Sequence, residues 1–377
     1  MRYRLAVVLA VLLGVSLLTS AALTPNTTAH DGPPTDDRLV QPTEGTYVWP
    51  YTSKSQSIDK RTLALTVIVH GDTERTKRLL TDPSSLNWST AEGDDPVFDT
   101  SPWHPARGAT RYTYLMSERD DRGKWVHSEY QLQDGTYLGT RTHLRAYPSP
   151  SGNWTAFQPH VEYWDWYRLR HTVTGVAPAA RQLENDLRRQ PVVSDVDRVY
   201  HGHRGGGSDG WTTVVGLAPA ALVIAAAAPV VSRTQWETEQ TDFVAFPLTL
   251  VALVLGVRVA GVAAEGLFPG VTPKLFAGLL YPVLVVGPLL LARHFARDMP
   301  ANLAPLLAIV GLGAAFVLDM NALGVSKVSV DLVIHRAALA SSLGAFAYGV
   351  ALDDRRQKNA ALVAWVMTLA ASLFGFV

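Results

Sequence analysis

The stretch FVAFPLTLVALVLGVRVAGVAA, residues 243–264, decides the architecture of this chain. It contains a single charged residue, Arg258, and a helix needs about 20 mainly apolar residues to cross the hydrocarbon core of a bilayer. Comparable runs occur on both sides of it, and together they predict six transmembrane helices, at 211–231, 243–264, 275–292, 303–323, 333–352 and 360–377. Residues 211–377 are therefore predicted to form an all-α membrane domain.

The residues before 211 are more polar and contain three N-glycosylation sequons, at Asn26, Asn87 and Asn153. Because glycan acceptors face the outside of the cell, residues 24–210 are predicted to be extracytoplasmic and the chain to be a multi-pass glycoprotein of the cell membrane. The charges between the spans favour the same orientation. Arginine and lysine are concentrated in 232–242, 293–302 and 353–359, whereas the opposite loops contain only Lys274 and Lys327.

The order of segments predicts five parts. Residues 1–23, with Arg2 and Arg4 before an apolar run, are typical of a signal peptide or a signal-anchor helix. Residues 24–45 are rich in Pro, Thr and Asp, which favours a flexible stalk. An ordered domain is expected at 46–200, a Gly-rich hinge at 201–210, and the membrane domain from 211 onward.

Composition excludes several classes of function. The chain has no cysteine, which removes thiolate nucleophiles, zinc–thiolate sites and disulfides. Its formal net charge is zero and it has no basic patch, so nucleic acid is not an expected partner. Neither a phosphate-binding or dinucleotide-binding glycine motif nor a Gly-x-Ser-x-Gly elbow is present, and no cofactor is predicted.

The outer domain is predicted to be α+β, with a mostly antiparallel sheet and two helices. Residues 62–70 are rich in β-branched side chains and predict a buried strand. A short helix follows at 73–81, with Asp72 as its cap, and a second helix is expected at 177–189, before Pro191. Alternation and aromatic content predict further strands at 110–117, 125–131, 137–147 and 158–174.

Polar residues on two of these strands form the first group of candidates for ligand or anion binding. Side chains two apart share a face of a strand, so Arg141 and Arg145 lie with His143, and His160 lies with Glu162. The candidates are Arg141, His143, Arg145, His160, Glu162 and His171. His171 and Asp165 have the opposite parity to His160 and Glu162.

Three interpretations of this face remain open. The arginines and His143 could bind an anion such as phosphate or sulfate. His143, His160 and Glu162 could bind a metal ion, but one His-x-Glu pair without a third fixed ligand is weak support, so no metal site is predicted. The face could also be solvated and carry cross-strand ion pairs. Trp164 and Trp166 share a face that could stack on a sugar.

Ionisable residues inside the predicted spans form the second group, because such side chains are costly in a bilayer. They are Arg258, Asp319, His335 and Arg336. At 1.5 Å per residue, Arg258 lies about 22 Å and Asp319 about 24 Å above the cytoplasmic ends of their helices, in the outer leaflet. Glu265 lies near the same level. The alternatives are an interhelical ion pair, such as Arg258 with Asp319, a pocket for a lipid head group or polyprenyl phosphate, and an ion path.

The outer domain resembles the C-terminal domain of LssY-type proteins, an uncharacterised envelope membrane protein family. The similar segments are Arg141-Thr-His-Leu-Arg-Ala-Tyr147, His160-Val-Glu-Tyr-Trp-Asp165, Arg170-His-Thr172 and Ala180-Arg-Gln-Leu-Glu-Asn-Asp-Leu187, within residues 60–190. In some bacterial relatives this domain is fused to DedA-like and phosphatidic-acid-phosphatase-like membrane domains. The membrane half of this chain has no phosphatase signature, and the resemblance implies no settled activity.

These observations predict an integral membrane protein of the cell envelope with an outward-facing, LssY-like ligand-binding or sensing domain. The expected partners are membrane lipid and a surface glycan, a lipid-linked substrate or an envelope protein. The alternative is a membrane enzyme that acts on lipid-linked or phosphorylated envelope substrates at the outer leaflet.

Overall fold

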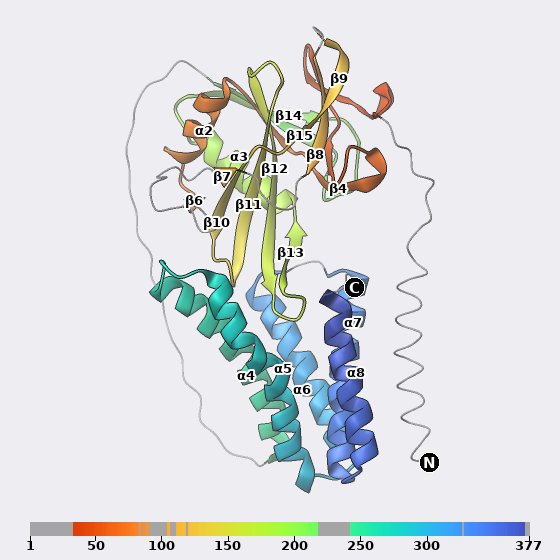
Figure 1. Ribbon diagram of the computed structural model, residues 1–377. Coiled ribbons are helices and arrows are strands. Elements are labelled where there is room, and N and C mark those ends of the chain that lie inside the picture. The colour runs from red at the N-terminus through yellow and green to blue at the C-terminus, as the bar shows by residue number, and fades with distance from the viewer. Residues whose placement is uncertain are drawn as a thin grey trace.

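The computed structural model describes residues 33–82, 84–86, 88–89, 104–105, 111–117, 120–217, 242–325 and 328–373. An N-terminal β-rich domain of two sheets stands on the end of a C-terminal helical domain (Figure 1). The longest strands of the β-domain run toward the helices, so their ends lie at the boundary between the two domains.

The smaller sheet is antiparallel and has the order β1-β2-β8-β3-β4, with β9 paired to β8. Two short 3-10 helices, η1 (Asp36–Arg38) and η2 (Ile58–Lys60), accompany it. Edge-to-face contacts of Trp49 with Tyr51 and Trp125 hold it together. Its strands are β1 (Val40–Thr43), β2 (Thr46–Val48), β3 (Tyr51–Ser53), β4 (Arg61–Ala64), β8 (Tyr112–Ser117) and β9 (Asp120–His127).

The larger sheet has the order β14-β15-β5-β12-β11-β10-β6, with β13 paired to β12 and β7 to β10. Its pairs are antiparallel except β5 with β15, which is parallel. Its strands are β5 (Val67–His70), β6 (Trp88–Ser89), β7 (His104–Pro105), β10 (Tyr130–Gly135), β11 (Thr140–Pro148), β12 (Trp154–Asp165), β13 (Arg170–Gly175), β14 (Val193–Tyr200) and β15 (Trp211–Leu217).

One face of the larger sheet is apolar and is covered by two helices, α2 (Thr73–Thr81) and α3 (Ala177–Arg188). Leu80 of α2 and Leu183 of α3 pack there against Leu144 and Phe157 of the sheet. As predicted, Asp72 caps α2, since its carboxylate accepts a hydrogen bond from the Arg75 N–H. The other face of the strands carries the polar candidates.

The single strand predicted at 62–70 is wrong, because the chain changes sheets within it. Leu65 N donates to Pro50 O, beside the smaller sheet, while Thr66 N donates to Phe157 O of the larger one. The run is therefore divided into β4 and β5. Residues 64–69, which span the change of sheet, are all buried, which explains why composition alone reads as one strand.

The hinge predicted at 201–210 and the start of the span predicted at 211–231 are also corrected. Residues 211–217 form β15, which lies between β14 and β5. Gly206 of this loop packs against the smaller sheet: its O accepts from Ala64 N, and a Cβ on it would lie 2.6 Å from Thr62 O. Gly206 has a φ of +56°, so glycine serves a fixed turn here. Residues 218–231 lie outside the described residues.

The N-terminal segments differ from prediction where the structure describes them. Val40–Thr43, assigned to the stalk at 24–45, forms strand β1 and pairs with β2. Its alternating burial, with Val40 buried, anchors it in the sheet. The predicted signal peptide or anchor at 1–23 lies outside the described residues.

The helical domain contains α4 to α8 and the short 3-10 helix η3 (Ala296–Asp298). Four stretches in the described residues, rather than the six predicted, are long and apolar enough to cross a membrane: 244–267, 273–298, 304–322 and 330–351. They are compatible with an integral, multi-pass membrane protein. The helices are α4 (Asp242–Leu267), α5 (Pro273–Phe295), α6 (Ala304–Ala322), α7 (Val330–Ala351) and α8 (Arg355–Leu373).

Candidate functional site

The register of β11 and β12 brings the first group of candidates together on one face. Arg141 lies opposite Glu162, His143 opposite His160, and Arg145 opposite Gln158. We call Arg141, His143, His160 and Glu162 the sheet cluster. Its members are only 3–7% exposed, so the polar face is buried rather than solvated. A buried face of this composition needs specific partners for its charges.

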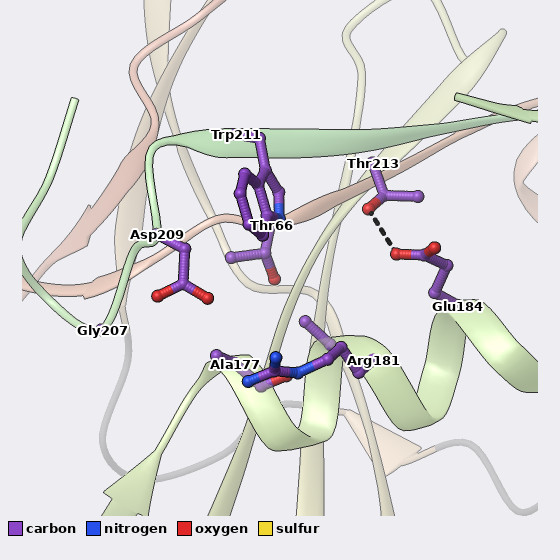
Figure 2. Close-up of a pocket in the computed structure, with 9 residues that line it drawn as sticks. Thr66, Ala177, Arg181, Glu184, Gly207, Asp209, Trp211 and Thr213 are labelled. Atoms are coloured by element: carbon purple, nitrogen blue, oxygen red, sulfur yellow. Dashed lines mark hydrogen bonds between the residues drawn. The ribbon is translucent and has the colours of Figure 1, made fainter. Parts of the chain in front are cut away.

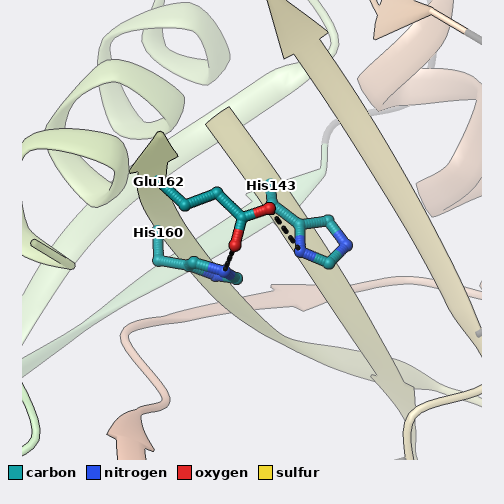
Figure 3. Close-up of side chains that lie close together, drawn as sticks. All are labelled: His143, His160 and Glu162. Atoms are coloured by element: carbon teal, nitrogen blue, oxygen red, sulfur yellow. Dashed lines mark hydrogen bonds and ion pairs between the residues drawn. The ribbon is translucent and has the colours of Figure 1, made fainter. Parts of the chain in front are cut away.

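Glu162 is the centre of the sheet cluster (Figure 3). Its Oε1 accepts from Arg141 Nε at 2.8 Å, and its Oε2 lies 3.2 Å from His160 Nε2. His143 Nδ1 lies 3.8 Å from Oε1, and the two imidazole rings are 4.9 Å apart. The carboxylate thus lies between two imidazoles and one guanidinium.

Glutamines on the adjoining strands orient the imidazoles and the guanidinium. His143 Nε2 lies 3.0 Å from Gln131 Oε1, and Gln158 Nε2 lies 3.2 Å from His160 Nδ1. Arg141 donates to Gln133 Oε1. The sequence indicated none of these roles, although Gln131 and Gln133 have the period-two spacing of residues that share a face.

Burial determines the protonation of the sheet cluster. Burial, reinforced by the positive charges near it, lowers the pKa of His143 well below 6.5 despite the attraction of Glu162. Burial alone would raise the pKa of Glu162, but the hydrogen bond from His160 and the surrounding cationic groups hold that pKa well below its usual value. Near neutral pH the site therefore contains a neutral His143 beside an ionised Glu162.

One nitrogen in this site has no partner. His143 Nδ1 is buried and makes no hydrogen bond, although its ring is fixed by Gln131 on the other side. Since Nε2 faces an amide oxygen, that nitrogen carries the proton, and Nδ1 directs a lone pair toward the carboxylate. Because Nδ1 faces the Glu162 carboxylate between two other polar side chains, a ligand bound there would supply the missing contact.

Arg145 lies farther along β11 than the sheet cluster. It is opposite Gln158, two residues farther from the position opposite Glu162 than His143 is. Burial and then the charge of Arg145 lower the pKa of Arg111. Arg141 of the predicted anion site is already bound to Glu162, and anion binding by Arg141, His143 and Arg145 stays a prediction.

His171 joins the sheet cluster, contrary to its expected parity. The segment between β12 and β13 turns with Leu169 at a φ of +47°, and His171 then lies opposite Trp164, on the Glu162 face. Its Nδ1 lies 3.3 Å from Arg141 Nη2 and its Nε2 lies 3.0 Å from Tyr137 O. His171 thus links the cluster to the turn between β10 and β11.

The second group of candidates lies where the strand ends meet the helices. Arg258 of α4 donates two hydrogen bonds to Asp319 of α6, at 2.9 and 2.8 Å. The same guanidinium donates to Leu138 O at 2.6 Å and to Trp164 O at 2.9 Å. The ion pair therefore holds two turns of the β-domain as well as two helices.

Glu265 makes the complementary contact at the end of α4. Its two carboxylate oxygens accept from Tyr137 N at 2.6 Å and Leu138 N at 3.0 Å. We call Arg258, Glu265 and Asp319 the docking cluster. Arg258 binds the carbonyl of Leu138 and Glu265 binds its amide, while Asp319 holds Arg258 in place.

A second ion pair joins the turn after β12 to α7. Arg336 binds the carboxylate of Asp165 and lies 4.7 Å from the centre of the Tyr167 ring. His335 does not contact the β-domain in this way, since its Nε2 faces Thr368 O of α8 at 3.2 Å. Arg258, Asp319 and Arg336 thus lie at the end of the helices that carries the β-domain, and their depth in a bilayer stays a prediction.

The remaining candidates are placed as follows. Trp164 and Trp166 are buried in the core shared with the helices, so they offer no face to a sugar. Asn153 is exposed in the loop before β12, while Asn26 and Asn87 lie outside the described residues. A cavity lined by Thr66, Arg181 and Glu184 holds only about 20 Å³, room for one water (Figure 2).

No protein-family model matches the chain, and no curated protein or solved structure is significantly similar to it. The arguments about function therefore depend on the geometry of the sheet cluster and the docking cluster.

Proposed function

We propose that this chain is an integral membrane protein of the cell envelope whose outward-facing β-domain binds a ligand at the sheet cluster and transmits that event to the membrane helices. The observation that carries this proposal is a continuous series of contacts. Arg141 joins Glu162 to His171, His171 reaches Tyr137 O, and Tyr137 N donates to Glu265 of α4. The similarity of residues 60–190 to LssY-type domains is part of this proposal.

The distances involved are short enough for such coupling. Trp164, whose carbonyl Arg258 binds, follows Glu162 by two positions, which is about 7 Å along a strand. The contact between α4 and the turn after β12 is tight, since a Cβ on Gly261 of α4 would lie 3.0 Å from the Trp166 ring. A rearrangement of Glu162 therefore acts on α4 through two routes.

The docking cluster favours sensing over an enzyme of lipid-linked substrates. A lipid-phosphate pocket needs a cation that is free to bind an anion. Arg258 is 6% exposed and gives its hydrogen bonds to Asp319 and two backbone carbonyls. Its geometry suits a structural clamp between domains.

A double-mutant cycle on the full chain in detergent tests the coupling. We expect Glu162→Gln and Glu265→Gln to show a coupling energy of about 0.5–2 kcal/mol in unfolding free energy. Asp331→Asn, at the same end of the bundle but outside the contacts, is the matched control and should be additive with Glu162→Gln within about 0.5 kcal/mol. Additivity of Glu162→Gln with Glu265→Gln would overturn the proposal.

Orientation is tested separately, and the lack of native cysteines makes this direct. Asn153→Cys places a thiol on the β-domain, and Arg355→Cys places one at the far end of the bundle, where both residues are exposed. A membrane-impermeant maleimide should label Asn153→Cys in intact cells and Arg355→Cys only after permeabilisation. The reverse pattern would place the sheet cluster in the cytosol.

A further inference from the structure

We infer that His143, His160 and Glu162 form a binding site for one divalent transition-metal ion, with zinc as the best fit. One ligand atom from each residue lies within 4.8 Å of the other two, and this triad is buried. The three side chains converge from two adjacent strands, β11 and β12 (Figure 3). This inference names a ligand class for the sheet cluster and depends on the proposed function only for its physiological role.

The separations between the ligand atoms suit zinc. Bonds of 2.0–2.1 Å in a tetrahedral site place neighbouring ligand atoms about 3.3 Å apart. His160 Nε2 and Glu162 Oε2 are already 3.2 Å apart, and the ligand atom of His143 lies within 4.8 Å of those of the other two residues. Small side-chain rotations bring all three within bonding distance of one ion. Two imidazoles and one carboxylate favour zinc over magnesium or calcium, which prefer oxygen ligands.

The unpartnered nitrogen of His143 is the independent observation. Nδ1 is buried, lacks a hydrogen bond and is directed into the triad, while Nε2 is held by Gln131. Metal-binding histidines typically donate their other N–H to such an oxygen, which fixes the tautomer and the ring. An ion at Nδ1 would give this nitrogen the partner that the protein does not supply.

The protons of the site can be balanced without a co-reactant. His143 already carries its proton on Nε2, and Glu162 is ionised. In the empty site His160 Nε2–H faces Glu162 Oε2, so binding moves that proton to Nδ1, and Gln158 turns its amide oxygen toward it. Arg141 keeps Oε1, which leaves Oε2 for the ion.

Three protein ligands leave a fourth position at the ion. Because Arg141 already compensates the charge of Glu162, a bound dication introduces excess positive charge into a buried site. An anionic oxygen in the fourth position reduces that excess. The site is therefore suited to a zinc ion together with hydroxide or another small oxyanion.

The test is titration of the EDTA-stripped full chain in detergent with zinc chloride alone, followed by calorimetry and metal analysis. We expect one ion per chain in the wild type. His143→Ala, His160→Ala and Glu162→Gln should each abolish stoichiometric binding, whereas Gln131→Ala should weaken it roughly 10- to 100-fold. His201→Ala is the matched control, because His201 and His203 form the other close histidine pair in the described residues and should not contribute.

Two results would overturn the site: no stoichiometric zinc binding by folded wild type, or binding that His201→Ala removes and His143→Ala leaves intact. If the alanine variants fail to fold, cobalt in the wild type decides the question. Four-coordinate cobalt gives intense visible bands, and weak octahedral bands would contradict the triad. Zinc binding without any coupling to Glu265 would leave the site standing and overturn the sensing role instead.

Discussion

The sheet cluster lies on β11 and β12, and the docking cluster on α4 and α6 binds backbone groups at one end of that strand pair, yet the polar atoms of the two clusters are satisfied to different degrees. In the docking cluster, Arg258 binds both oxygens of Asp319 and two carbonyls, and both oxygens of Glu265 accept backbone amides. In the sheet cluster, His143 Nδ1 is buried without a hydrogen bond, and so is Nε2 of the neighbouring Gln133.

This difference separates structural charges from charges that can bind a ligand. A buried charge with a complete set of partners stabilises one arrangement and offers nothing to a ligand. A buried polar group that lacks a partner lowers the stability of the empty protein and is stabilised when a ligand supplies the missing contact. Ionisable residues in a membrane helix are therefore not sufficient to locate a binding site.

The largest effect is expected from breaking the docking cluster. Arg258→Met leaves Asp319 and the carbonyls of Leu138 and Trp164 without their donor, and should cost about 3–5 kcal/mol of unfolding free energy. Thermal and denaturant unfolding in detergent measure it. Arg258→Met combined with Asp319→Leu should recover much of the loss, since no unpaired charge remains. An Arg258→Met variant as stable as wild type would contradict the clamp.

Glu265→Gln should have the next largest effect. The substitution keeps the shape of the side chain but removes the charge from two hydrogen bonds to the turn at Tyr137 and Leu138, which is worth about 1.5–3 kcal/mol. Proteolysis of the folded protein should become faster at this turn. Asp331→Asn, at the start of α7, is the control and should change stability by less than about 0.5 kcal/mol.

The sequence predicted parts of both clusters, and only those parts that local periodicity determines. Alternation placed Arg141 with His143 and His160 with Glu162, and the helical rise placed Arg258 and Asp319 at one depth. It could not predict that His143 faces His160, because strand register depends on contacts between distant segments. The parity of His171 was missed because the turn after β12 resets the alternation.

Two further errors have physical causes of the same kind. The partners of Arg258 include the carbonyl of Leu138, which is 120 residues away and has no side-chain signature. Residues 211–217 are apolar and β-branched, so a short buried strand was interpreted as the start of a membrane helix. Composition detects burial, but it does not distinguish burial in a sheet from burial in a bilayer.

A smaller effect is expected when the sheet cluster is altered in metal-free protein. His143→Phe fills the same space and removes a nitrogen that has no partner, so the cost should be about 1 kcal/mol, mainly the lost contact with Gln131. Unfolding in the presence of EDTA measures it. A loss of 3 kcal/mol or more would show that the cluster is a structural clamp like the docking cluster, and the distinction between the two would fail.

Lowering the pH should destabilise the β-domain gradually, and the effect of His201 is the reference with which the contribution of His143 is compared. Burial, with the charge of His203 adding to it, lowers the pKa of His201 to about 4. Below pH 6.5 the unfolded chain binds a proton at His201 that the folded chain does not bind. The contribution of neutral His201 to stability is therefore complete above pH 6.5 and is lost as the pH falls from 6.5 to about 4. With solvent screening taken into account, His201→Gln should reduce this acid-induced loss of stability by about 1 kcal/mol.

The measurement is acid unfolding of the wild type and of His201→Gln. The acid-induced loss of stability that remains in His201→Gln should include the contribution of His143, which is buried and neutral. An acid response that disappears entirely with His201 would show that the sheet cluster tolerates a protonated His143, contrary to the site described here.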